Sequence, residues 1–224
     1  MKLLKSLLSA AAVACLVVAP LTAEAGLTLK LYDGVNTVTV FDNIAPDLNL
    51  SANVIVYTGT IGIWSLNVTT GVGVGYIPGF FGLDLNSINA NSSSSGTLKI
   101  MLSQDGLNFG APGPKPVSAG IGGTVGSGGN LSYSLYADTS NTLFGTPGSG
   151  LAFAGSSAAG AFSNSGGGTI NLGNPFSLTM VTTLTHTKAA TTSYDFSGQV
   201  PEPASIALVG LALLGLGAAT RRKA

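Results

Sequence analysis

The segment Phe176–Thr187, FSLTMVTTLTHT, carries the clearest structural pattern in the chain. Its odd positions are hydroxyl residues with one exception, and its even positions are mainly apolar. A period of two sustained over 12 residues is typical of a β-strand with one face toward a core and one toward water. We therefore predict that this strand belongs to an antiparallel sheet. The even positions are Phe176, Leu178, Met180, Thr182, Leu184 and His186.

The same alternation recurs on both sides of this segment. Residues 27–32 and 35–41 alternate around Asp33-Gly34, a dipeptide that favours a hairpin turn. Seven or more short strands separated by turn residues predict an all-β chain folded as an antiparallel β-sandwich. The sequence leaves a jelly-roll topology open. The other predicted strands are 54–57, 61–69, 71–76, 97–103, 131–137 and 193–200.

Three segments lack this alternation. Thr58-Gly59-Thr60 is predicted to separate two strands. Residues 109–129 contain three prolines and many glycines, which favours a long loop, an irregular crossover or an internal boundary. Residues 155–168 are rich in Ala, Ser and Gly and are predicted to be flexible.

The composition excludes several classes of protein. The chain has 224 residues, 8% of them charged, and a mean hydropathy of +0.46, so it is neither a disordered chain nor a typical soluble enzyme. Residues 26–199 contain four lysines, seven aspartates and no arginine, which gives a net charge of −3. They carry no basic stripe, and we therefore predict no nucleic-acid partner.

Residues 1–25 have the three parts of a secretory signal peptide, and we expect the Sec-type machinery to export the chain. Two lysines precede an apolar run at 7–18, and a small-x-small site follows. An uncut membrane anchor is the alternative, but the run is short for a span of about 20 residues. The only cysteine, Cys15, lies within this segment, so the mature chain has no disulfide. The predicted cleavage residues are Ala23, Ala25 and Gly26.

Residues 200–224 form a second terminal signal. A short Pro-Glu-Pro motif precedes the apolar run Ala204–Ala219, which would rise about 24 Å as a helix. A basic end follows, and the positive-inside rule would keep it in the cytoplasm. The rest of the chain then lies outside the membrane, which agrees with the signal peptide. The motif is Val200, Pro201, Glu202 and Pro203, and the basic end is Arg221, Arg222 and Lys223.

A short motif, an apolar helix and a basic end, in this order, resemble the PEP-CTERM sorting signal of exopolysaccharide-producing Gram-negative bacteria. The resemblance implies that an exosortase cuts near the motif after transient insertion of the helix into the inner membrane. It further implies a final place at the cell surface or outside the cell. It covers only residues 200–224 and leaves the activity of the β-rich domain at 26–199 undetermined.

The sequence offers few residues for catalysis. The only histidine, His186, falls on the apolar side of its strand, and no Gly-x-Ser-x-Gly elbow occurs. The mature chain cannot supply the ligands of a structural zinc site. We therefore predict no enzymatic activity, no metal and no cofactor. Calcium held by Asp33, Asp42 and Asp47 is an alternative to their role as ordinary turn residues.

Aromatic residues suggest one binding site. Trp64, Tyr57 and Tyr76 could form a platform on which sugar rings stack, although core packing is the alternative role. The leading hypothesis is a structural or interaction protein of the surface or the extracellular matrix, as in a biofilm. A carbohydrate-binding module that anchors the chain to exopolysaccharide is the first alternative, and an extracellular hydrolase is the second.

Overall fold

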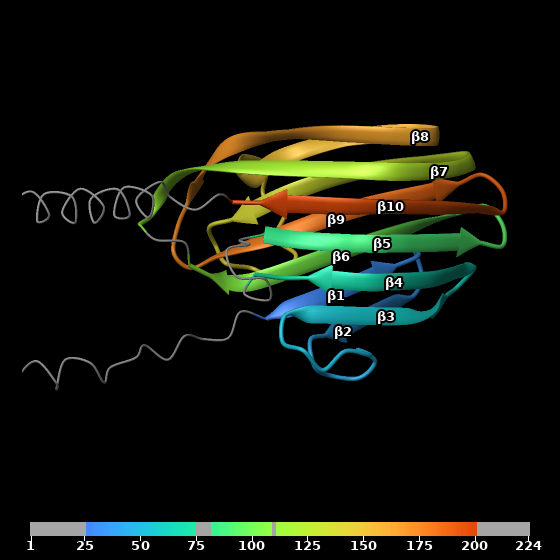
Figure 1. Cartoon of the computed structure of the whole chain (residues 1–224), viewed down its shortest axis with the longest axis horizontal. Coiled ribbons are helices and arrows are strands. Elements are labelled where there is room, and N and C mark those ends of the chain that lie inside the picture. The colour runs from blue at the N-terminus through green and yellow to red at the C-terminus, as the bar shows by residue number, and fades with distance from the viewer. Residues whose placement is uncertain (1–25, 75–81, 109–110, 201–224) are drawn as a thin grey trace, which may run out of the picture.

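The computed structural model describes residues 26–74, 82–108 and 111–200, and within them the chain is all-β (Figure 1). The predicted signal peptide and the sorting tail from residue 201 onward lie outside the described residues. The elements are β1 (Leu27–Tyr32), β2 (Thr37–Phe41), β3 (Val54–Ile61), β4 (Trp64–Val72), β5 (Gly82–Ser92), β6 (Gly96–Leu107), β7 (Gly113–Asp138), the 3-10 turn η1 (Gly148–Gly150), β8 (Leu151–Leu172), β9 (Phe176–His186) and β10 (Ala190–Gln199).

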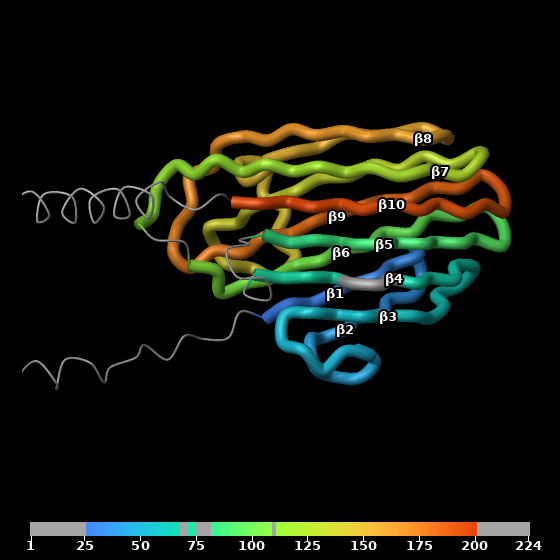
Figure 2. The backbone as a smooth tube through the Cα atoms, viewed as in Figure 1, coloured from blue at the N-terminus to red at the C-terminus, as the bar shows by residue number. Residues whose placement is uncertain are grey.

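All strands pair antiparallel in one continuous sheet, with the order β2-β1-β6-β9-β7-β10-β5-β4-β3, and β8 pairs with β7. Residues 118–124 of β7 pair with β10, and residues 129–138 of β7 pair with β9. Between these two halves the register shifts, and Gly128 has a φ of 76°. The β7–β8 hairpin folds over at this point, and the sheet doubles on itself (Figure 2).

The result is a sandwich of two layers. The first layer holds β2, β1, β6, β9 and the second half of β7, and the other layer holds β3, β4, β5, β10 and the first half of β7. Apolar side chains from both layers fill the space between them, among them Leu29, Leu102, Met180, Leu85 and Phe196. The meander β3–β4–β5 stays within one layer, and the chain crosses between the layers from β2 to β3, from β5 to β6 and from β9 to β10. The fold is therefore an antiparallel β-sandwich.

Strand β9 confirms the alternation that the sequence showed, with one difference. Every even position from Phe176 to His186 is buried. Ser177 and Thr179 on the other face are also buried, although we expected this face to be wet. The loop at 139–147 covers them: the hydroxyl of Ser177 donates to the carbonyl oxygen of Thr142 at 2.7 Å.

Three segments expected to lie outside strands are strands. Thr58-Gly59-Thr60 continues β3, and the turn follows at Gly62, whose φ of 53° suits a tight two-residue connection. Most of 109–129 and all of 155–168 belong to β7 and β8, which pair with each other. Their glycines permit close backbone approach, since a Cβ at Gly167 would lie 2.1 Å from the carbonyl oxygen of Val117.

The two ends of the sandwich differ. Gly26 and Val200, the first and last described residues, lie at the same end (Figure 1). The long connections 42–53 and 139–150 also lie at this end, which we call the loop end. The opposite end, the turn end, carries short connections such as 33–36, 62–63 and 187–189.

Candidate functional site

The outer face of the layer with β5, β10, β7 and β8 carries a polar hollow of about 470 Å³. The strand register sets its residues in two rows, since Leu85 and Phe196 turn inward and their neighbours turn outward. Asp84, Ser197, Gly120 and Ser165 follow one another across the four strands, and Asp195, Gly122 and Ser163 form the adjacent row.

The side chains that line this hollow are suited to form hydrogen bonds with a ligand. Gly120 and Gly122 leave its floor without side chains. Carboxylates, amides and hydroxyls form the walls, so the hollow offers several acceptors and donors close together. This array complements a ligand rich in hydroxyl groups. The wall residues are Asp84, Asn86, Asp195 and Ser197 on one side and Ser163, Asn164 and Ser165 on the other.

The two carboxylates of the hollow differ in their surroundings. Burial raises the pKa of Asp84, and the negative charge of Asp195 raises it further. Asp195 accepts a hydrogen bond of 2.5 Å from the backbone N–H of Ser87. Ser87 has a φ of 57° and lies where the β5–β10 register shifts, so an irregularity of the sheet holds Asp195 in place. No local sequence pattern marks this pair, because only the register brings the two strands together.

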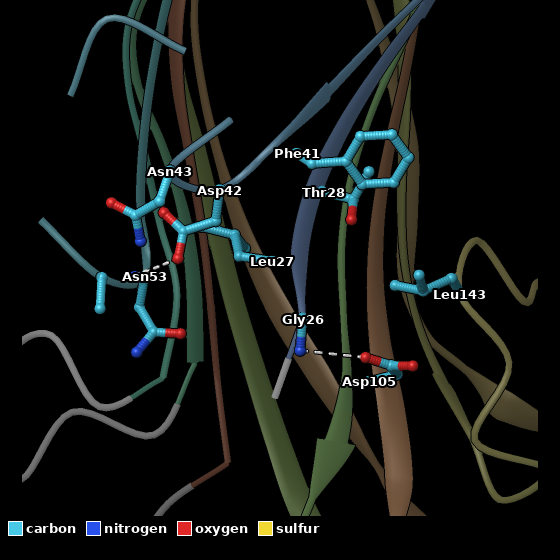
Figure 3. A pocket seen from close by; sticks show the side chains of 10 residues that line it. Gly26, Leu27, Thr28, Phe41, Asp42, Asn43, Asn53, Asp105 and Leu143 are labelled. Carbon is cyan, nitrogen blue, oxygen red and sulfur yellow. Dashed lines mark hydrogen bonds between the residues drawn. The ribbon is translucent and has the colours of Figure 1, made fainter. Parts of the chain in front are cut away.

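A second hollow, of about 420 Å³, lies at the loop end (Figure 3). The backbone N–H of Gly26 donates to Oδ1 of Asp105 at 3.1 Å. Asp42 accepts a hydrogen bond of 2.7 Å from the N–H of Asn53 through Oδ2. Oδ1 of Asp42 is buried and has no hydrogen-bond partner among the described residues. The hollow therefore contains two carboxylates, and no cationic side chain lines it.

The structure does not bring together the aspartates predicted as calcium ligands. Asp33 lies at the turn end, and the side-chain and backbone N–H groups of Asn36 lower its pKa. Asp42 and Asp47 lie at the loop end, where Asp47 accepts from the N–H groups of residues 43, 49 and 56. Across the described ranges, no cluster of three or more His, Cys, Asp or Glu side chains could hold a metal ion.

His186 lies in the core, between the two layers. It is 1% exposed, and its ring centroid lies 4.9 Å from that of Trp64. Its Nδ1 is 2.7 Å from Oγ of Ser92, and its Nε2 is 2.9 Å from Oγ1 of Thr192. Burial lowers the pKa of His186 and favours the neutral imidazole. Both ring nitrogens are thus engaged by hydroxyls in a site closed to solvent.

The predicted sugar-stacking platform needs correction. Trp64 is 1% and Tyr57 is 6% exposed, and both belong to the core cluster. Burial also raises the pKa of the Tyr57 hydroxyl. Neither ring offers a face to a ligand, because strands β3 and β4 turn both side chains inward. Tyr76, the third member, lies outside the described residues.

The sorting motif begins where the fold ends. Gln199, the last residue of β10, pairs with Gly82 and Ser118, and Val200 is 2% exposed. Residues 201–203 of the motif and the basic end lie outside the described residues, as does most of the predicted cleavage site, of which only Gly26 is described. No helix in the described part of the chain is long and apolar enough to cross a membrane.

Comparison with known proteins supports the resemblance at the C-terminus. Residues 199–223 match the family described as the PEP-CTERM protein-sorting motif. No curated protein matches the chain.

The solved structures that match this chain have low sequence identity and low TM-scores. TmCBM61, solved with β-1,4-galactotriose, is 8% identical with a TM-score of 0.34, over 51% of this chain and 70% of that one. The PA14 sugar-binding domain from an RTX adhesin is 12% identical with a TM-score of 0.34, over 78% and 90%. A family 11 carbohydrate-binding module from Clostridium thermocellum is 14% identical with a TM-score of 0.32, over 78% and 96%.

Proposed function

We propose that this chain is an exported, non-catalytic interaction protein of the cell surface or extracellular matrix, sorted by an exosortase. The observation that carries the proposal is the PEP-CTERM motif at residues 199–223, which begins at the last residue of β10. Because β10 ends at Gln199 and Val200 is already buried, a cut between Pro201 and Pro203 would leave every described strand intact.

The positions of the two described ends also support the proposal. Gly26 and Val200 both lie at the loop end. While the C-terminal segment is inserted in the inner membrane, the loop end would face the membrane and the turn end would point away. The polar outer faces of the sandwich would then be open to extracellular partners.

The hollow of Figure 3 suits removal of the signal peptide. Cleavage after Ala25 would convert the N–H of Gly26 into an ammonium group, 3.1 Å from Oδ1 of Asp105. Two carboxylates, those of Asp105 and Asp42, line this hollow. The new cation would therefore form a charge-assisted hydrogen bond at a site that already has negative charge.

The absence of catalysis is part of the proposal. His186 is the only histidine of the chain, and its two nitrogens contact Ser92 and Thr192 inside the core. A general base must reach a substrate within hydrogen-bonding distance, and a side chain that is 1% exposed does not.

The test is the intact mass of the full chain, expressed with its exosortase and in a strain that lacks the enzyme. With the enzyme, we expect a surface or medium species that begins at Gly26 and ends near Pro201. Without it, the chain should stay in the membrane with residues 221–223 attached. A chain that keeps its C-terminal residues in both strains would overturn the proposal, and Glu202→Ala provides a variant of the motif itself.

A second candidate function is binding of a hydroxyl-rich polysaccharide, supported by the hollow with Asp84 and Asp195. Hydrogen bonds to charged groups contribute about 1.5–3 kcal/mol each, so the pair Asp84→Ala and Asp195→Ala should weaken exopolysaccharide binding by roughly tenfold or more. Ser65→Ala, on the same outer face but away from the hollow, is the matched control. If the chain with Asp84→Ala and Asp195→Ala binds exopolysaccharide as well as the Ser65→Ala control does, this role is contradicted.

A further inference from the structure

The β8 edge of the sandwich is open. β8 runs from Leu151 to Leu172, and β7 is the only described strand that pairs with it. Alternate residues of such a strand direct their backbone N–H and C=O groups away from the sheet, and no described strand receives those of β8. Such an edge is a template on which another strand can pair.

The residues of β8 do nothing to block such pairing. The strand has 22 residues, and none of them is charged or is proline, although charge and proline are the usual protection of an edge. Most of its side chains are Ala, Ser or Gly, and residues 158–161 and 163–169 are all exposed.

The opposite edge shows the contrast within the same molecule. There the loop 42–53 lies beside the start of β3 and bonds to both backbone groups of Val56. The N–H of Val56 donates to Oδ1 of Asp47 at 2.9 Å, and the carbonyl oxygen of Val56 accepts from the N–H of Leu48 at 2.9 Å. No such loop bonds to β8 among the described residues.

β8 also offers two open edges side by side. It bends at Gly160, whose φ is 124°, so residues 151–158 lie in one layer and residues 160–172 in the other. A Cβ at Gly168 would lie 3.3 Å from the carbonyl oxygen of Ala152, which shows how closely the halves approach. The side-chain amide of Asn164 donates to Oγ of Ser157 at 3.2 Å and joins them.

We propose that a second copy of this chain pairs with β8 edge to edge. A two-fold axis perpendicular to the layers would set each half of β8 antiparallel to its counterpart, so both layers would continue across the interface. In a second copy the two halves of β8 lie the same distance apart, so both halves can pair with their counterparts at once. Two-fold dimers are also the commonest assemblies. The lack of charge on β8 means that self-pairing brings no like charges together.

The experiment uses charge on β8, away from the polar hollow. Ala154 and Ser156 are exposed on the outer face of the first layer. Full chains with A154K/S156K or with A154E/S156E are purified after export, and their dimer dissociation constants are measured by sedimentation velocity. Like charges face one another across the two-fold axis in each variant, so the dimer of each should be weaker by on the order of tenfold.

A control variant at β3 and a mixture of the Lys and Glu variants test whether the charge on β8 itself causes the effect. Thr58→Lys with Thr60→Lys places the same charges on the outer face of β3, at the opposite edge, and should leave the dissociation constant unchanged. Mixing the Lys and Glu variants should restore a heterodimer, because opposite charges then meet across the interface. A wild-type chain that is monomeric at all concentrations, or a mixture that does not associate, would overturn the proposal. Pairing of β8 with a different protein, in place of its own copy, would also overturn it.

Discussion

At the β3 edge a loop of the chain bonds to the backbone of Val56, whereas at the β8 edge no described segment bonds to the outer backbone. The β3 side has large side chains in its core, including Trp64, and a 12-residue loop, 42–53, held by Asp47. The β8 side is built from Ala, Ser and Gly, and its two layers approach closely. The difference suggests that one side provides stability and the other provides a surface for association.

The largest expected effect tests the first half of this comparison. Trp64→Ala removes the largest fully buried side chain of the β3 side and should lower the free energy of unfolding by about 3–5 kcal/mol. Denaturant unfolding of the variant and of Thr58→Ala, an exposed neighbour, provides the measurement. A loss below about 1 kcal/mol would show that the core near Trp64 contributes little.

The next effect concerns the cap of the β3 edge. Asp47→Ala removes the acceptor for the N–H groups of Asn43, Asn49 and Val56. Because hydrogen bonds to a charged group are worth about 1.5–3 kcal/mol, we expect a loss of about 2–3 kcal/mol in the free energy of unfolding. Asp47→Asn keeps one acceptor oxygen and should lose less. Equal stability of all three proteins would mean that the loop does not cap the edge.

A smaller effect tests the close packing of the glycine-rich side. A Cβ at Gly123 would lie 2.2 Å from the carbonyl oxygen of Ser193, so Gly123→Ala forces β7 and β10 apart. Overpacking of this kind costs about 1–3 kcal/mol. Gly148→Ala is the control, because nothing lies within 4 Å of its added Cβ. If both variants unfold alike, the close approach is not required.

The smallest expected effect is a pH dependence of the stability, caused by His186 beside Trp64. The pKa of His186 is lowered from 6.5 in the folded chain, so the unfolded chain binds a proton first. Stability should therefore be full above about pH 6.5 and should fall as the pH drops from there toward the lower pKa of the folded state. In His186→Gln this part of the slope should vanish. An unchanged slope in thermal unfolding between pH 7 and 5 would contradict a buried neutral imidazole.

The sequence predicted the strands that have one apolar and one polar face. β1, β2, β9 and β10 lie where alternation placed them, and the core positions of β9 are correct. The sorting motif at 199–223 was also predictable, since it is a local pattern. The second half of β7 also matches the strand predicted at 131–137. The first half of β7 and most of β8 were not predictable, because their stability comes from pairing over a long hairpin, and glycine-rich sequence gives no period of two.

The candidate site was less predictable than the fold. Asp84 and Asp195 meet only through the β5–β10 register, which no local pattern encodes. Trp64 and Tyr57 were suggested as ligand residues, and the structure buries both. An aromatic side chain in a strand packs inward or outward according to the phase of that strand. The turn expected at 58–60 lies instead at Gly62, and the phase around it was therefore uncertain from sequence.

Residue-specific amide hydrogen exchange at two protein concentrations tests the asymmetry of the edges most directly. We expect the N–H of Val56, bonded to Asp47, to be protected at both concentrations. The outward N–H groups of β8 should exchange rapidly in dilute protein and become protected in concentrated protein as copies pair. β8 amides whose exchange does not change with concentration, or a Val56 amide that exchanges as fast as they do, would contradict this asymmetry.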